Sequence, residues 1–196
     1  LVDDDGDTKV DVEATPDEWI LFWGSDDFAA SHTVLSQLAK SLEYLHLSNS
    51  LPDLLVSRGR YFSSVSGQLA RSTVFMSARL LNANSFRRAL WLGSTPPHQA
   101  TLFGPGARQY LDFYSTSFRL SADLNYFLQL SNHPGLRVQC LDLELVHMGD
   151  AGVSGQQAQR RLLEVARAYR RAFAWSCWFP FFARYVRRLA SLLRTD

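Results

Sequence analysis

Prolines and glycines divide this 196-residue chain into segments long enough for helices. Between residues 34 and 45, apolar side chains recur at three- and four-residue spacing, which places them on one face of a helix. A helix ending near Leu47 is therefore predicted. Its start has capping oxygens from Ser25, Asp26 and Asp27.

The later segments are also predicted to be helical. Ser50, Pro52 and Asp53 form a helix-start pattern, and the helix they begin is expected to reach about Asn82. Further helices are predicted over residues 84–92, 107–132, 136–148 and from Ser154 onward, with a loop over 93–106 and a kink or break at Pro180. Residues 136–148 also alternate like a strand, so helix and strand both stay open for that range. The sequence thus predicts an all-α fold, a bundle of four to five helices over residues 19–196, after an extended acidic arm over residues 1–18.

Charge is distributed unevenly along the chain, although the net charge is only +1. Residues 1–27 contain ten acids and one lysine, a balance of −9, and residues 150–196 contain nine arginines and three acids, a balance of +6. The two ends can attract each other or face separate partners. The apolar fraction of 46% supports one domain with a core, and two cysteines without a partner pattern favour a reducing compartment. The start at Leu1 indicates either a fragment or a terminus left after a targeting segment is removed.

The C-terminal region has an aromatic cluster between two groups of arginines. Such a segment suits a helix that lies among lipid headgroups or against a membrane subunit. The predicted lipid or partner contacts are Arg170, Arg171, Trp175, Trp178, Phe179, Phe181, Phe182, Arg184, Arg187 and Arg188. The alternative is that about half of these aromatic residues fill the bundle core. The longest charge-free apolar run, residues 172–183, is too short to cross a bilayer, which takes roughly 20 residues.

Catalytic and metal-binding motifs are not recognisable in the sequence. Five histidines and two cysteines lack metal-ligand spacing. Ser154 does not form a nucleophile elbow, because that motif needs another residue before the second glycine. The carboxylates expected on helices form no evident acid–base pair: Glu43, Asp112, Asp123, Asp142, Glu144 and Glu164. We therefore predict that the protein is not an enzyme and has no catalytic residue, metal, cofactor, nucleic-acid partner or small-molecule substrate. The one enzymatic route that stays open is a carboxylate pair that folding brings together.

Several segments are similar to those of a known helical family. The matching stretches are Leu21–Asp26 with Leu35–Tyr44, Ser77–Asn82 with Phe86–Leu90, and Ser117–Phe127 with Gly135 and Leu136. In order and pattern they resemble the peroxin eleven family, the membrane-elongation proteins of peroxisomes. The resemblance implies lipid-facing helices in a non-enzymatic protein. It leads us to expect a structural accessory subunit of a mitochondrial inner-membrane complex, most naturally the ATP synthase, whose partners are other subunits and anionic lipid. The alternative is a peroxisomal membrane-shaping protein that inserts amphipathic helices.

Overall fold

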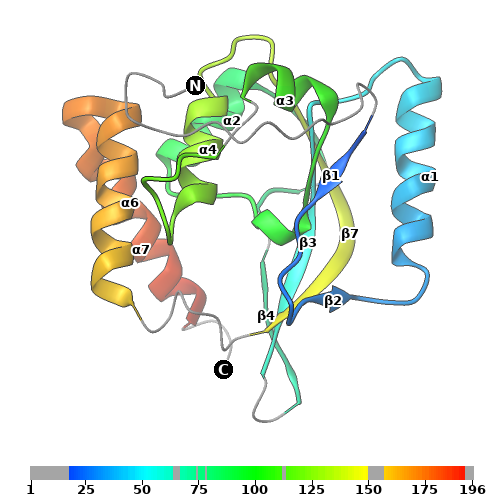
Figure 1. The fold of residues 1–196 in the computed structure, drawn as a ribbon, viewed down its shortest axis with the longest axis horizontal. Helices are drawn as coiled ribbons and strands as arrows, with labels where there is room; N and C mark the ends of the chain where they lie inside the picture. The colour runs from blue at the N-terminus through cyan, green and yellow to red at the C-terminus, as the bar shows by residue number, and fades with distance from the viewer. Residues whose placement is uncertain are drawn as a thin grey trace.

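A mixed β-sheet with helices on both faces replaces the predicted all-α bundle (Figure 1). The structure, a computed structural model, describes residues 18–63, 67–73, 75–77, 79–111, 114–149 and 157–192. Within these residues seven strands form one sheet. The fold is therefore α/β, and the all-α prediction is wrong. The predicted acidic arm lies outside the described residues, apart from Glu18.

Two parallel strands form the centre of the sheet, β3 (Leu54–Phe62) and β7 (Arg137–Gly149). Shorter strands extend the sheet on both sides, each antiparallel to its neighbour. On the β3 side these are β6 (Thr101–Phe103), β1 (Ile20–Leu21) beyond it, and β4 (Leu69–Thr73). On the β7 side they are β2 (Phe28–Ala29) and β5 (Arg79–Asn82).

Strand β3 shows why the helix predicted from Ser50 to Asn82 is wrong. Leu54 and Val56 belong to the core on one face of the sheet, whereas Leu55 belongs to the core on the other. A strand buried on both faces has a continuous apolar run, and periodicity alone does not separate such a run from a buried helix. The same range also contains β4 and β5. For residues 136–148, the strand alternative is right and the helix is wrong, because they lie in or beside β7.

Helices cover the two faces of the sheet unequally. Helix α1 (Val34–Leu47) packs on one face, where Val34 and Leu38 are buried. On the other face lie α2 (Ala83–Trp91), α3 (Pro105–Tyr110), α4 (Ala122–Leu130) and α6 (Ala158–Phe173), which contribute to the larger core. The short helix η1 (His98–Ala100) leads into β6. The helix predicted over residues 84–92 is confirmed as α2, and the helix predicted over 107–132 is wrong because two separate helices occupy that range.

The C-terminal helices meet at a break that lies before Pro180. Helix α6 ends at Phe173, and Ala174 has a positive φ of 49° at the start of the short helix η2 (Ala174–Cys177). Helix α7 (Trp178–Leu192) then begins, with Pro180 in its first turn. Proline is tolerated there because the first amides of a helix have no intrahelical acceptor. The break predicted at Pro180 is thus displaced to Ala174, and the predicted start at Ser154 lies outside the described residues.

Candidate functional site

Asp26 and Asp27 lie in a tight turn between β1 and β2. The turn is closed by the backbone amide of Asp27, which donates to the carbonyl of Gly24 at 3.2 Å. The amide of Gly24 in return donates to Oδ2 of Asp27 at 2.6 Å. Asp26 points to the end of β7, where a Cβ on Gly149 would collide with its carboxylate. These residues were predicted to begin a helix, but the fold instead fixes two neighbouring carboxylates at the end of the central strand.

His98 lies beside this acidic turn, at the start of η1. Its ring stacks on Phe22 with centroids 5.2 Å apart, and its Nε2 is 2.9 Å from the hydroxyl of Tyr114. Burial lowers the pKa of His98, and the carboxylates of Asp123 and Asp27 oppose that shift. The imidazole is therefore held neutral near pH 7 and makes a directed hydrogen bond to Tyr114.

Asp123 completes the group from the first turn of α4. Burial raises the pKa of Tyr114, and the nearby negative charge of Asp123 adds to this effect. Burial also raises the pKa of Asp27, with Asp26 adding to the shift and His98 opposing it. His98 thus interacts with carboxylates from two segments that are almost a hundred residues apart. This is the kind of carboxylate grouping, created by folding, that the sequence left open.

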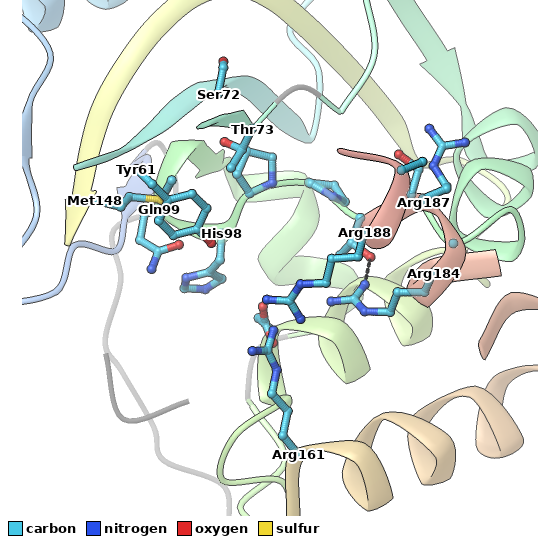
Figure 2. A pocket seen from close by; sticks show the side chains of 17 residues that line it. Tyr61, Ser72, Thr73, His98, Gln99, Met148, Arg161, Arg184, Arg187 and Arg188 are labelled. Carbon is cyan, nitrogen blue, oxygen red and sulfur yellow. Dashed lines mark hydrogen bonds between the residues drawn. The ribbon is translucent and has the colours of Figure 1, made fainter. Parts of the chain in front are cut away.

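A cavity of about 730 Å³ extends from His98 and Asp123 toward the C-terminal helices. Its walls include Tyr61, Ser72, Thr73, Met148 and the segment from Gly93 to Gln99. Arg161 from α6 and Arg184, Arg187 and Arg188 from α7 also line it. Figure 2 shows Arg161, Arg184 and Arg188 extending toward the middle of the cavity, with His98 across from them. The cavity therefore combines a carboxylate and an imidazole with a cationic wall.

Gly93 fixes α7 in the position that builds this wall. It has a positive φ of 78°. A Cβ at this position would lie only 2.7 Å from the Cα of Arg184, so the backbone of α7 passes directly over the glycine. Nearby, a guanidinium nitrogen of Arg184 donates to the hydroxyl of Thr95. The loop before η1 and the first half of α7 are thus held together by close backbone contact and a hydrogen bond.

The ten predicted contact residues fall into three environments. Arg184, Arg187 and Arg188 line the cavity beside His98. Arg170, Arg171, Trp178 and Phe181 line a second hollow of about 680 Å³ between α6 and α7. Of the remaining three, Trp175 is 90% exposed and Phe182 is 60% exposed, whereas Phe179 stacks on Trp91 with ring centroids 4.0 Å apart. Their role as lipid or partner contacts stays a prediction, as does the predicted location. No helix among the described residues is long and apolar enough to span a bilayer.

Sequence reasoning missed four residues of this site: Asp26, Asp27, His98 and Asp123. Asp26 and Asp27 had a usable signal, because a short apolar run such as Trp19–Trp23, followed by the turn signal of residues 24–27, is also typical of a buried strand. His98 and Asp123 had no local signal, since only the tertiary structure brings η1 and α4 together. Within the described part of the chain, no group of three or more potential ligands is arranged to hold a metal ion by itself.

No protein-family model and no curated protein sequence matches this chain. Solved structures do match it in fold, among them three of TarS from S. aureus. TarS 1–349 in complex with UDP-GlcNAc has a TM-score of 0.54 and 16% identity, over 88% of this chain and 49% of that one. The complex of TarS 1–349 with UDP has a TM-score of 0.50 and 17% identity, over 88% and 47%. A further TarS structure has a TM-score of 0.51 and 15% identity, over 91% and 31%. The chain thus spans about half the length of TarS 1–349.

These likenesses correct the expectations drawn from the peroxin resemblance. The fold is similar to that of TarS, and neither a family match nor a sequence relative supports a peroxin. A non-enzymatic accessory subunit of the ATP synthase, and a peroxisomal membrane-shaping protein, are therefore wrong predictions. The expectation of no small-molecule ligand is corrected too, because the neighbouring structures hold UDP or UDP-GlcNAc. The peroxin-like segments failed as evidence because they consist mostly of apolar patterning, which strands buried on both faces share with helices.

Proposed function

We propose that this chain forms part of a glycosyltransferase site that uses a UDP-linked sugar as donor. The observation that carries the proposal is the placement of His98 and Asp123 in the wall of a polar cavity, with the acidic turn of Asp26 and Asp27 near His98. The fold likeness to TarS structures that hold UDP and UDP-GlcNAc supports it. The chain spans about half of TarS 1–349. The proposal therefore covers the diphosphate and the reacting hydroxyl, and it assigns no residue to the nucleoside.

Asp26 and Asp27 suit the diphosphate of the donor through a divalent cation. Two carboxylates alone would repel a diphosphate, and their proximity already acts to raise the pKa of Asp27. A Mg²⁺ ion is commonly held by one or two carboxylates together with substrate phosphates, and does not need a full cage of protein ligands. The acidic turn fits that chemistry. When bound, such an ion would neutralise charge that develops on the departing diphosphate.

Asp123 is placed to act as general base. It lines the cavity beside His98, and its carboxylate can accept the proton of an acceptor hydroxyl. As that oxygen forms a bond to the anomeric carbon, the bond from this carbon to the diphosphate oxygen breaks. The hydroxyl proton goes to Asp123, and UDP leaves with the bonding electron pair. Atoms and charge balance without a further reactant.

His98 serves as a positioning residue between the two carboxylates. Burial lowers its pKa, so it does not add a positive charge beside Asp123 near pH 7. Its ring is stacked on Phe22 and its Nε2 is hydrogen-bonded to Tyr114. These two contacts fix the position of the imidazole.

Calorimetric titration with UDP-GlcNAc in the presence of Mg²⁺, and an assay of UDP release, test the proposal together. The double variant Asp26→Asn and Asp27→Asn should weaken donor binding at least about tenfold, because the carboxylates that hold the cation are lost. Asp123→Asn should keep donor binding and slow UDP release about 10²-fold or more, as expected for a general base. Glu43→Gln, an exposed change on α1, is the matched control and should alter neither quantity.

Two results would contradict this assignment. One is an absence of UDP-GlcNAc binding by the folded wild-type chain. The other is donor binding that the Asp26 and Asp27 changes leave untouched, since the acidic turn would then have no part in donor recognition.

A further inference from the structure

The cavity beside His98 has far more positive than negative charge on its walls. Four arginines line it, and Figure 2 shows that Arg161, Arg184 and Arg188 extend into it while the side chain of Arg187 points away. Asp123 is the one carboxylate among the described lining residues. A concave site with such an excess attracts anions and strengthens their binding, because the protein walls reduce screening by water.

The helices behind this wall do not neutralise it. Residues 157–192 contain eight arginines and a single acid, Glu164. The Glu164 carboxylate is already used elsewhere, because it accepts hydrogen bonds from the amides of Leu120 at 2.7 Å and Ser121 at 3.0 Å. It also accepts one from Nε of Arg160 at 3.3 Å. Glu164 is therefore not available to the four arginines that line the cavity, and residues 157–192 contain no other acid.

The wall is also organised in a way that suits tetrahedral oxyanions. Gly93 holds the backbone of α7 close, and Thr95 accepts a hydrogen bond from Arg184. The hydroxyl groups of Ser72, Thr73 and Ser94 line the same cavity, but each already donates to a backbone carbonyl, that of Gly59 for the first two and that of Phe75 for Ser94. The donors left for an anion in this wall are therefore the guanidinium groups. Arginine forks match the geometry of phosphate oxygens and are over-represented in phosphate recognition.

We infer that this cavity binds a phosphate group carried by the acceptor. The inference rests on the proposed function, which places the donor diphosphate at Asp26 and Asp27. Those two residues are not among the described residues that line the cavity, whereas His98 and Asp123 are. The arginine wall thus lies on the acceptor side of the general base. A phosphate held there would orient a hydroxyl of the same molecule toward Asp123.

Glycerol 3-phosphate is a suitable probe, with glycerol as its uncharged match. In calorimetry at low ionic strength, the wild-type chain should bind glycerol 3-phosphate and not glycerol. The double variant Arg161→Gln and Arg188→Gln should weaken this binding at least about tenfold, because two charge-assisted hydrogen bonds to the phosphate are lost. The control is Arg88→Gln with Arg119→Gln, which removes the same charge from exposed positions outside the cavity. It should bind like the wild type.

The inference is overturned if the wild type fails to bind glycerol 3-phosphate at low salt. It is equally overturned if both double variants bind it as the wild type does. A third arm separates the two phosphate sources. The double variant Arg161→Gln and Arg188→Gln should bind UDP-GlcNAc as tightly as the wild type does. If this variant loses UDP-GlcNAc binding, the arginine wall belongs to the donor site and an acceptor site is refuted. If UDP-GlcNAc does not bind at all while glycerol 3-phosphate does, the proposed function fails and the anion site stands. Circular dichroism melting of each variant verifies that it is folded.

Discussion

Replacing Gly93 with alanine should destabilise the protein through two separable effects. The glycine has φ of 78°, and a residue with a Cβ pays about 1 kcal/mol or more to adopt such a conformation. The new methyl group would also lie 2.7 Å from the Cα of Arg184, and this neighbour is backbone that cannot rotate aside. Overpacking of that kind costs about 1–3 kcal/mol. We expect a total loss of about 2–5 kcal/mol, a large part of the 5–15 kcal/mol typical of a folded domain.

Gly67 offers a matched control for this change. It has a similar φ of 67°, but a Cβ added there would meet nothing within 4 Å. Gly67→Ala should therefore cost only the conformational part, about 1 kcal/mol. Urea unfolding followed by circular dichroism gives both free energies of unfolding. Equal losses for the two variants would refute the close contact between the loop at Gly93 and helix α7, and with it the geometry of the arginine wall.

Three further predictions concern the core and titrating groups. Phe86→Ala should lower the free energy of unfolding by about 3–5 kcal/mol in urea titration, because the ring is fully buried between Phe75 and Phe127; a loss below 1 kcal/mol would contradict this packing. Burial acts to raise the pKa of Glu144, but hydrogen bonds from His147 and Arg60 lower it overall. The ionised Glu144 therefore stabilises the fold fully above the unfolded pKa of about 4.3, and this stabilisation is lost as the pH falls through the lower folded pKa. The difference in free energy of unfolding between the wild type and Glu144→Gln, measured by thermal melting at decreasing pH, should therefore become smaller in acid. Burial raises the pKa of Cys140 to about 11, so in a Cys177→Ser background a thiol reagent at pH 8 should label it only on unfolding.

Local signals predicted only part of the fold. Helix α2 was found because a short apolar pattern ends at the breakers after Leu92, and the end of α1 at Leu47 was found for the same reason. Strands β3 and β7 were harder to recognise, because both contribute residues to the two cores and so lack a clean alternation. Their parallel pairing joins segments about eighty residues apart, and nothing in either segment alone specifies its partner.

Much of the candidate site depends on that pairing. The end of β7 brings Gly149 against Asp26. His98 lies in η1, which leads into strand β6 of the same sheet. Asp123 joins them only after α4 has packed over the same face. Single aspartates and a lone histidine are common in any sequence, so their spacing predicted surface or core positions. The grouping is a property of the tertiary structure, and the shifted pKa values of Asp27 and His98 result from burial that the sequence does not display.

The C-terminal arginines illustrate how one charge signal in the sequence fits two different classes of partner. The sequence showed that α6 and α7 together have far more positive than negative charge, and such an excess attracts anions. An isolated amphipathic segment offers lipid as the simplest source of negative charge. In the folded chain the same helix surface is divided: Arg184 and Arg188 face a cavity shared with His98 and Asp123, whereas Trp175 and Phe182 remain exposed. The anion that best fits the arginines is therefore one that also reaches a general base, and this describes a phosphorylated substrate better than a bilayer.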